Sequence, residues 1–165
     1  LRAELGHLPF ADATFDIVTA FDVLEHVPDD AAALHDIVRV LRPGGALLLT
    51  VPLHPCLWSA HDAALHHQRR YTPAGIRRRV RDAGLLIERE TAMNAALLGP
   101  IALVRLARRR RAAPQSDAAL PPAPVNWLFG AVLAAERLWL RHVDLPWGVS
   151  QIVVARRPGG PENVR

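Results

Sequence analysis

Cysteine, lysine and long apolar runs are rare or absent in this sequence. The single cysteine, Cys56, excludes an internal disulfide and an all-cysteine metal site, so we expect a reducing compartment, the cytoplasm. No apolar run reaches the roughly 18 residues needed to cross a bilayer. All twenty basic residues are arginine, and the net charge is only +4. Because arginine codons are rich in G and C, we attribute the arginines to genome composition and predict no nucleic-acid partner.

Apolar residues, in contrast, are plentiful. Half of the 165 residues are hydrophobic, which is enough for one globular domain with a sizeable core. The chain begins with Leu1 rather than methionine, in a pattern typical of the end of a strand. We therefore expect an N-terminally truncated chain.

Residues 15–52 carry the clearest pattern, which predicts a strand, a helix and a second strand. Residues 15–20 form a short, β-branched and nearly all-apolar run, as a buried central strand requires. Asp29 or Asp30 can cap the helix that follows. One apolar stripe is expected along that helix, formed by Leu34, Ile37, Val38 and Leu41.

The end of this unit is marked by proline and glycine. Pro43 is expected to end the helix, and Gly44-Gly45 to form the turn into a second buried strand over residues 46–51. Two parallel strands joined by a helix predict a ligand crevice at the carboxyl ends of the strands.

Residues 53–71 lack clean periodicity and are rich in Trp, His, Asp and Arg. A long polar loop of this kind is typical of a functional lid. Thr72-Pro73 predicts a new helix, with Ile76, Val80 and Ala83 facing inward and Gly84 ending it. A strand over residues 85–91 follows.

Residues 92–148 predict a helical insertion before the last strand. An apolar helix over 94–107, broken at Gly99-Pro100, runs into the arginines of 108–111, and a Pro/Ala-rich linker occupies 112–124. Asn126 is expected to cap a second helix that ends near His142. We therefore expect four units: a core half over 1–91, the insertion over 92–148, the last core strand over 149–157 and a flexible tail over 158–165.

Four motifs stand in a characteristic order: Leu8-Pro9-Phe10, Phe15-Asp16-Ile17-Val18, Leu24-Glu25-His26-Val27, and Arg39-Val40-Leu41-Arg42-Pro43-Gly44-Gly45. Together they resemble the class I S-adenosylmethionine-dependent methyltransferases of the small-molecule type, over residues 1 to about 91. The resemblance implies an α/β, Rossmann-like doubly wound sheet with helices on both faces and an antiparallel last strand. It also implies that strands four to seven are present and that the N-terminal half, with its Gly-rich loop, is missing.

The resemblance also implies cofactor contacts. Glu4 holds the acidic position that accepts from the adenine amino group, and Leu5 offers its backbone amide to the ring. Phe21 and Asp22 follow strand four, beside the methyl-sulfonium end of S-adenosylmethionine. Because the Gly-rich half of the site is missing, we expect that this chain alone does not bind the cofactor.

The lid offers candidate catalytic residues at the acceptor pocket. Methyl transfer needs a base only if the acceptor must lose a proton. We propose His67 as this base, with His61 paired to Asp62 as the alternative. Arg69 or Arg70 would bind an acidic substrate group, and Tyr71 closes the same segment. In the competing interpretation these side chains only brace the lid, with one of the two arginines paired to Asp62.

Three further expectations concern side chains near the crevice. His61, Asp62, His66 and His67 could ligate zinc, but the dense arginines oppose a cation, so we expect no metal. Glu25 and His26 are expected to fix the loop after strand four by hydrogen bonds. Cys56 is expected to be a small apolar filler.

The leading hypothesis is S-adenosylmethionine-dependent methyl transfer to a small-molecule or lipid-linked acceptor. A broken apolar helix beside a polybasic cluster suggests peripheral membrane contact through 94–111, whereas the competing interpretation packs this helix over the sheet. A non-catalytic binding or remnant domain is the second hypothesis. A nucleic-acid methyltransferase is opposed by the segment 22–26, Asp-Val-Leu-Glu-His, which stands in place of an Asn/Asp-Pro-Pro-Tyr/Phe motif.

Overall fold

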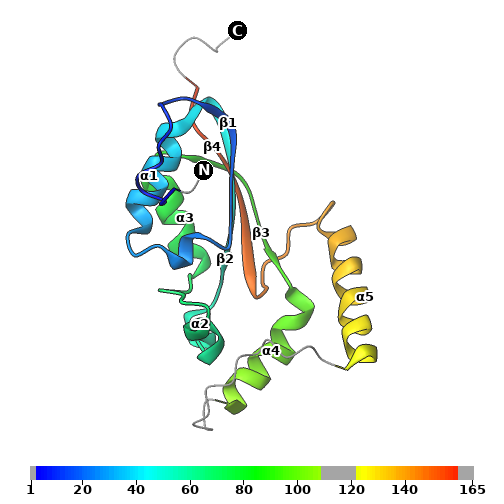
Figure 1. Ribbon diagram of the computed structural model, residues 1–165. Helices are drawn as coiled ribbons and strands as arrows, with labels where there is room; N and C mark the ends of the chain where they lie inside the picture. Colours follow the sequence, from blue (N-terminus) through cyan, green and yellow to red (C-terminus); the bar gives the residue numbers. More distant parts are fainter. Residues whose placement is uncertain (1–2, 109–121, 160–165) are drawn as a thin grey trace.

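The computed structural model describes residues 3–108 and 122–159, which form a four-stranded sheet with helices (Figure 1). The sheet order is β1-β2-β4-β3, where β1 pairs with β2 in parallel and β4 is antiparallel to both of its neighbours. This arrangement confirms the predicted α/β fold class with an antiparallel last strand. The strands are β1 (Phe15–Phe21), β2 (Leu41–Pro52), β3 (Leu86–Met93) and β4 (Ser150–Arg156).

The helices lie between and beyond these strands. The longer ones are α1 (Asp30–Val40), α3 (Pro73–Asp82), α4 (Ala95–Arg108) and α5 (Ala123–Trp139). Three short ones, η1 (Leu24–His26), η2 (Pro55–Leu57) and α2 (Ala60–Ala64), lie at the ends of β1 and β2. The predicted loop over 53–71 therefore contains two short helices.

Helix α1 begins as predicted but ends earlier. Asp29 caps it, since its carboxylate accepts from the backbone amide of Ala32 at 2.9 Å. The helix ends at Val40 rather than at Pro43, because Leu41 already pairs with Phe15 of β1. The pairing then jumps to Ile17 with Ala46, and Gly44 adopts a φ of 79° in the skipped stretch. The glycine turn thus lies inside the bounds of β2 as an irregularity.

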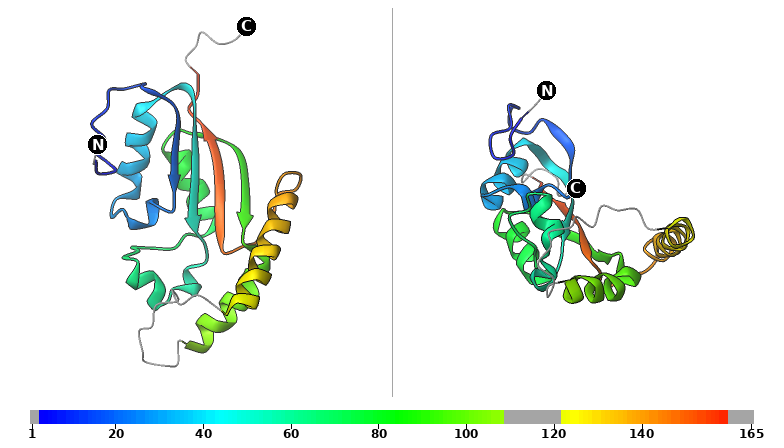
Figure 2. Two further views of the ribbon diagram at one scale, coloured as in Figure 1. Left: turned by 45° about the vertical axis from the view of Figure 1, so that its right-hand side comes forward. Right: turned by 60° about the horizontal axis from the view of Figure 1, so that its bottom comes forward.

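Both α1 and α3 cover the same face of the sheet (Figure 2). Their apolar residues Leu34, Ile37, Ile76 and Val80 are fully buried with Leu47 and Leu49 of β2. Alternating residues of β1 point the other way, so Ile17 is 61% and Phe21 54% exposed. The expectation of a fully buried central strand at residues 15–20 is therefore wrong for the described part of the chain, where β1 is an edge strand.

The helical region before β4 differs from the prediction at two points. Helix α4 is continuous, with Pro100 inside it, and is not broken at Gly99-Pro100. Helix α5 begins at Ala123 and ends at Trp139, so Asn126 lies inside it and is not its cap. The prolines at the start of α5 remove no hydrogen bond from the helix, because the first amides of a helix lack an intrahelical partner.

Helix α5 lies beside α4, and the carboxylate of Glu136 links the two helices. Glu136 of α5 accepts hydrogen bonds from the backbone amides of Asn94 and Ala96, at the start of α4. No residue of α5 is buried.

Among the described residues, the helices are all too short or too polar to span a bilayer. Of the predicted linker over 112–124, residues 112–121 lie outside the described residues. Of the predicted tail over 158–165, residues 160–165 also lie outside them. The division into four units stays a prediction.

We predict that Gly148→Ala destabilises the protein. Gly148 is buried before β4, and a Cβ there would lie 2.2 Å from the carbonyl oxygen of Met93. Because backbone must shift to relieve this overlap, the free energy of unfolding should fall by about 1–3 kcal/mol. Gly99→Ala is the matched control, since a Cβ at this exposed helical position meets nothing within 4 Å and should stabilise by up to about 1 kcal/mol. Urea unfolding measures both, and equal stability of Gly148→Ala and wild type would contradict the prediction.

Candidate active site

The candidate site lies where β1 and β2 end, at the carboxyl edge of the sheet. Asp22 follows β1 directly and turns the chain with a φ of 50°. Its amide donates to the hydroxyl of Thr50 at 2.9 Å, and this hydroxyl donates to the Asp22 carboxylate at 3.1 Å. Phe21 and Asp22, two of the four predicted cofactor residues, therefore lie together at the edge, with Asp22 held by β2.

The other two predicted cofactor residues precede β1. Leu5 lines an open apolar hollow of about 280 Å³ together with Phe10, Ile17 and Val23. Glu4 is exposed beside it and does not line the hollow. The hollow runs along β1, so Leu5 flanks the strand that ends at Phe21.

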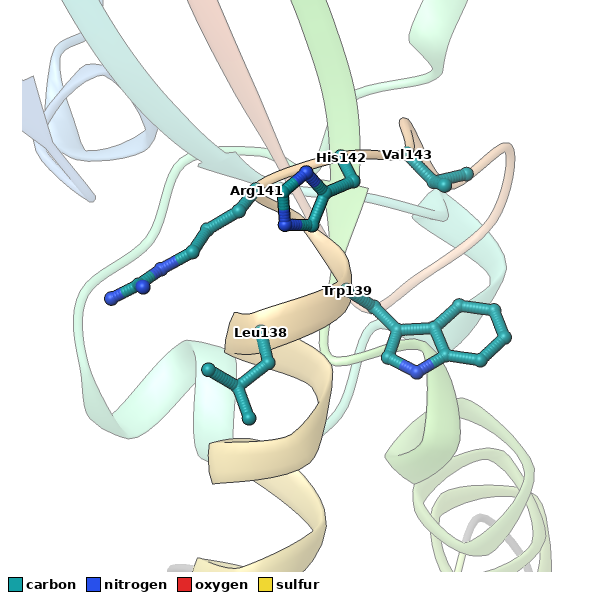
Figure 3. Close-up of a pocket in the computed structure, with 5 residues that line it drawn as sticks. All are labelled: Leu138, Trp139, Arg141, His142 and Val143. Atoms are coloured by element: carbon teal, nitrogen blue, oxygen red, sulfur yellow. The ribbon is translucent and has the colours of Figure 1, made fainter.

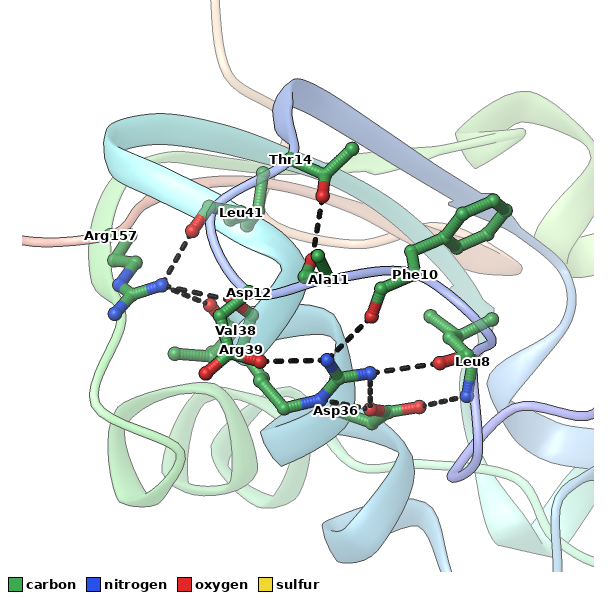
Figure 4. A network of polar contacts seen from close by, with 10 residues as sticks. All are labelled: Leu8, Phe10, Ala11, Asp12, Thr14, Asp36, Val38, Arg39, Leu41 and Arg157. Atoms are coloured by element: carbon green, nitrogen blue, oxygen red, sulfur yellow. Dashed lines mark hydrogen bonds and ion pairs between the residues drawn. The ribbon is translucent and has the colours of Figure 1, made fainter.

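The segment before β1 is fixed to α1 by a polar network that the sequence did not reveal (Figure 4). Arg39 donates to the carbonyl oxygens of Leu8 at 2.9 Å and Phe10 at 2.7 Å, and the Asp36 carboxylate accepts from the Leu8 amide. Although burial favours the neutral acid, the Leu8 amide and the Arg39 guanidinium together lower the pKa of Asp36. The i, i+3 spacing of Asp36 and Arg39 was the available signal. The network positions the residues that line the hollow.

Asp62 organises the lid. Its fully buried carboxylate accepts from the Ser59 amide at 2.9 Å and from Nε of Arg70 at 2.6 Å, and it lies 3.1 Å from Nδ1 of His67. Burial favours the neutral acid, yet the hydrogen bond and charge of Arg70 prevail, so the pKa of Asp62 is lowered. The predicted bracing pair is therefore formed by Arg70 rather than Arg69.

His61 is not the partner of Asp62, so that alternative is wrong. Its Nδ1 is buried and has no hydrogen-bond partner in the described residues. Cys56, in η2, is exposed, so the expectation of a buried apolar filler is also wrong. The short helices of the lid turn this side chain outward.

Arg69 and Tyr71 join the lid to the start of α1. Arg69 forms an ion pair with Asp30 at 3.0 Å and donates to the carbonyl oxygen of Pro28. The buried Tyr71 hydroxyl donates to Asp30 at 2.9 Å, and burial together with this bond raises the pKa of Tyr71. Both side chains are thus directed at Asp30, and the structure does not bring them together with His67.

A second group of side chains does meet at His67. The rings of His26 and His67 lie edge to face with centroids 4.7 Å apart. Glu25 is 1% exposed, and burial raises its pKa to about 7. The expectation that Glu25 and His26 fix the loop by side-chain bonds is wrong, because the Glu25 carboxylate has no partner among the described residues. Instead the Glu25 carbonyl oxygen accepts from the Gln68 amide at 2.7 Å. Burial also lowers the pKa of His67, against the opposing effect of Asp62.

Comparison with known proteins follows the same segments. Residues 1–49 match the family described as a methyltransferase domain. A probable S-adenosylmethionine-dependent methyltransferase of Mycolicibacterium smegmatis is 35% identical over 89 residues, covering 53% of this chain and 35% of that protein. The ubiquinone/menaquinone biosynthesis C-methyltransferase of Klebsiella pneumoniae is 41% identical over 70 residues, or 41% of this chain and 28% of that protein. The chain thus spans about a third of the length of these curated relatives.

The fold is shared with solved structures. A putative methyltransferase from Bacillus halodurans superposes with a TM-score of 0.54 at 17% identity, covering 94% of this chain and 76% of that one. The antiparallel last strand is the one that the sequence resemblance implied. The sequence match over residues 1–49 and this topology are thus similar to those of the class I S-adenosylmethionine-dependent methyltransferases.

Proposed function

We propose that the protein transfers a methyl group from S-adenosylmethionine to a small-molecule acceptor. The observation that carries this proposal is the family match, because residues 1–49 include the hollow, β1, η1 and α1. These elements form one side of the candidate site, and the lid that carries His67 forms the other. The name of the Klebsiella relative, a quinone C-methyltransferase, supports a small-molecule acceptor. A non-catalytic binding domain remains the alternative hypothesis, and turnover separates the two.

Within this function, Glu4, Leu5, Phe21 and Asp22 would contact the cofactor. Methyl transfer is an in-line displacement, so the protein mainly aligns the acceptor with the sulfonium and excludes water. His67 would assist the loss of the acceptor's proton, since Asp62 holds its Nδ1 and leaves Nε2 as the working nitrogen. Arg69, Arg70 and Tyr71 would keep the lid in place through Asp30 and Asp62.

We also propose that the acceptor is lipid-linked, because the surface of α5 and its following turn is apolar and exposed. Trp127 is 74%, Trp139 66% and Trp147 62% exposed. Leu138, Trp139, Arg141, His142 and Val143 line a hollow of about 440 Å³ at the end of α5 (Figure 3). Tryptophan beside arginine is typical of helices that lie in the interface of an anionic bilayer. The sequence predicted membrane contact through 94–111. Within this segment, α4 exposes Leu103, and residues 109–111 lie outside the described residues.

Removal of the Glu4 carboxylate should weaken cofactor binding. In the complete enzyme, Glu4→Ala should raise the Kd for S-adenosylmethionine about 5–10-fold, as the loss of one hydrogen bond to the adenine amino group predicts. Glu88→Ala is the matched control, because Glu88 is an exposed carboxylate on β3, at the opposite edge of the sheet. Titration calorimetry measures both, and an unchanged Kd for Glu4→Ala would remove this residue from the site.

Replacement of His67 should slow turnover. His67→Ala should lower kcat by about 100-fold or more, because assistance in proton transfer contributes at least this much. His66→Asn is the control: His66 is exposed next to His67 and has a φ of 58°, which asparagine tolerates. The assay follows S-adenosylhomocysteine formed with phenol, hydroquinone and amine acceptors. Wild-type turnover by His67→Ala would exclude the proposed role.

The α5 surface should bind anionic membranes. The double substitution Trp127→Ala/Trp139→Ala should weaken binding to phosphatidylglycerol vesicles about tenfold or more, because it removes two exposed aromatic side chains. Leu86→Ala, an exposed apolar residue on β3, is the control. Vesicle flotation measures binding, with phosphatidylcholine vesicles as the uncharged comparison. If the wild-type protein does not bind anionic vesicles, the lipid-linked acceptor loses its support.

A further inference from the structure

The carboxylate of Glu25 is buried, and no other described residue donates a hydrogen bond to it. The residue is 1% exposed, and neither carboxylate oxygen has a partner among the described residues. Burial of an unpaired polar group costs free energy, so such a group in a folded protein calls for an explanation, such as an ordered water, a catalytic role or a bound ion. Glu25 lies in η1, directly after β1, where the candidate site is.

Two imidazoles lie next to this carboxylate. One nitrogen of His26, one nitrogen of His67 and one oxygen of Glu25 all lie within 4.8 Å of one another. Metal–ligand bonds of about 2.0–2.2 Å allow two ligands of one ion to be at most about 4.4 Å apart. A small closure would therefore bring the three atoms into one coordination sphere, and the exposed His26 side chain is free of described hydrogen bonds that would oppose it.

His67 is already oriented as a ligand would be. Its Nδ1 lies 3.1 Å from the Asp62 carboxylate, which leaves Nε2 to face a ligand. Metal-binding histidines usually donate their second ring N–H to a carboxylate or carbonyl oxygen, which fixes the ring and makes the binding nitrogen more basic. Asp62 supplies this contact and is itself held by Ser59 and Arg70.

The nearby charges permit a cation. Asp22 and Asp62 add negative charge near Glu25, and Arg70 adds positive charge. The Arg70 guanidinium, however, binds Asp62 and the carbonyl oxygen of Leu53, and Arg69 binds Asp30 and the carbonyl oxygen of Pro28. Neither arginine forms an ion pair with Glu25. The expectation of no metal was made for His61, Asp62, His66 and His67 and stays a prediction, whereas the two arginines near Glu25 are engaged by other acceptors.

We propose that Glu25, His26 and His67 bind a divalent transition-metal ion. One carboxylate and two imidazoles are a ligand set suited to zinc and its neighbours in the first transition row, and they leave coordination positions open. Binding itself is independent of the proposed function. Its role rests on that function: the ion would bind an acceptor oxygen and lower the pKa of its proton, which would pass to a water molecule, and His67 would then hold the ion in place of accepting the proton itself.

The test is titration of the complete, untagged protein with Co²⁺, followed by visible absorption, and with Zn²⁺ as competitor. Wild type should bind one equivalent with a Kd in about the micromolar range or tighter. Glu25→Gln and His26→Ala should each weaken binding at least about tenfold, and Asp62→Asn about 10–100-fold. His35→Ala is the control, because His35 is an exposed histidine on α1 whose Nδ1 contacts the Ala31 carbonyl oxygen.

Two outcomes would overturn the proposal. One is the absence of stoichiometric binding by wild type, and the other is equal affinity in wild type and Glu25→Gln or His26→Ala. Zn²⁺ should also raise the Tm of wild type and not that of Glu25→Gln, because only a ligand-binding native state is stabilised by mass action. Should Glu25→Gln fail to fold, His26→Ala decides alone, since this side chain is exposed. Metal binding is measured without turnover, so a protein that binds metal but transfers no methyl group would contradict only the proposed function.

Discussion

The buried carboxylate of Asp62 is the interaction on which the candidate site depends. It sits in the first turn of α2, accepts from the Ser59 amide and Arg70, and orients His67. A buried charge is stable only when it is paired and hydrogen-bonded, and removal of one partner leaves the other unsatisfied. The same carboxylate thus folds the lid back on itself and directs an imidazole toward the end of β1.

The lid is bonded to the segment that follows β1 through both backbone and side-chain hydrogen bonds. The Gln68 amide donates to the carbonyl oxygen of Glu25, and the Tyr71 hydroxyl donates to Asp30. These bonds fix the lid against η1 and the start of α1. A fixed lid suits a reaction in which alignment and exclusion of water do most of the work. In contrast, α5 is bonded to the start of α4 through Glu136 and to β3 through Arg89, and its apolar surface is exposed. The molecule therefore combines a hydrogen-bonded lid at the candidate site with an exposed apolar surface on α5.

Local patterns predicted much of the fold correctly. The helix cap at Asp29, one of the two predicted candidates, the Thr72 cap, the buried faces of α1 and α3, and the glycine at the end of α3 follow from residue chemistry within a few positions. The errors lie where a distant segment decides. Helix α1 ends at Val40 because Leu41 pairs with β1, and α4 stays continuous despite Pro100. Nothing near Glu25 in the chain indicated that its carboxylate would be buried without another residue as donor, because His67 and Gln68 of the lid, which lie against it, are about forty residues away.

The sequence by itself indicated the order of the main strands and helices along the chain and the resemblance to methyltransferases, because these depend on periodicity, capping and the order of short motifs. Only the tertiary structure decided how the residues of the candidate site are partnered. It assigned Asp62 to His67 and Arg70 instead of His61, and it directed Arg69 and Tyr71 toward Asp30. The physical reason is that a buried polar group takes the partner that the packing of separate segments brings within bonding distance. Among His61, His66 and His67, the spacing along the chain could not select that partner, and the fold of the lid did.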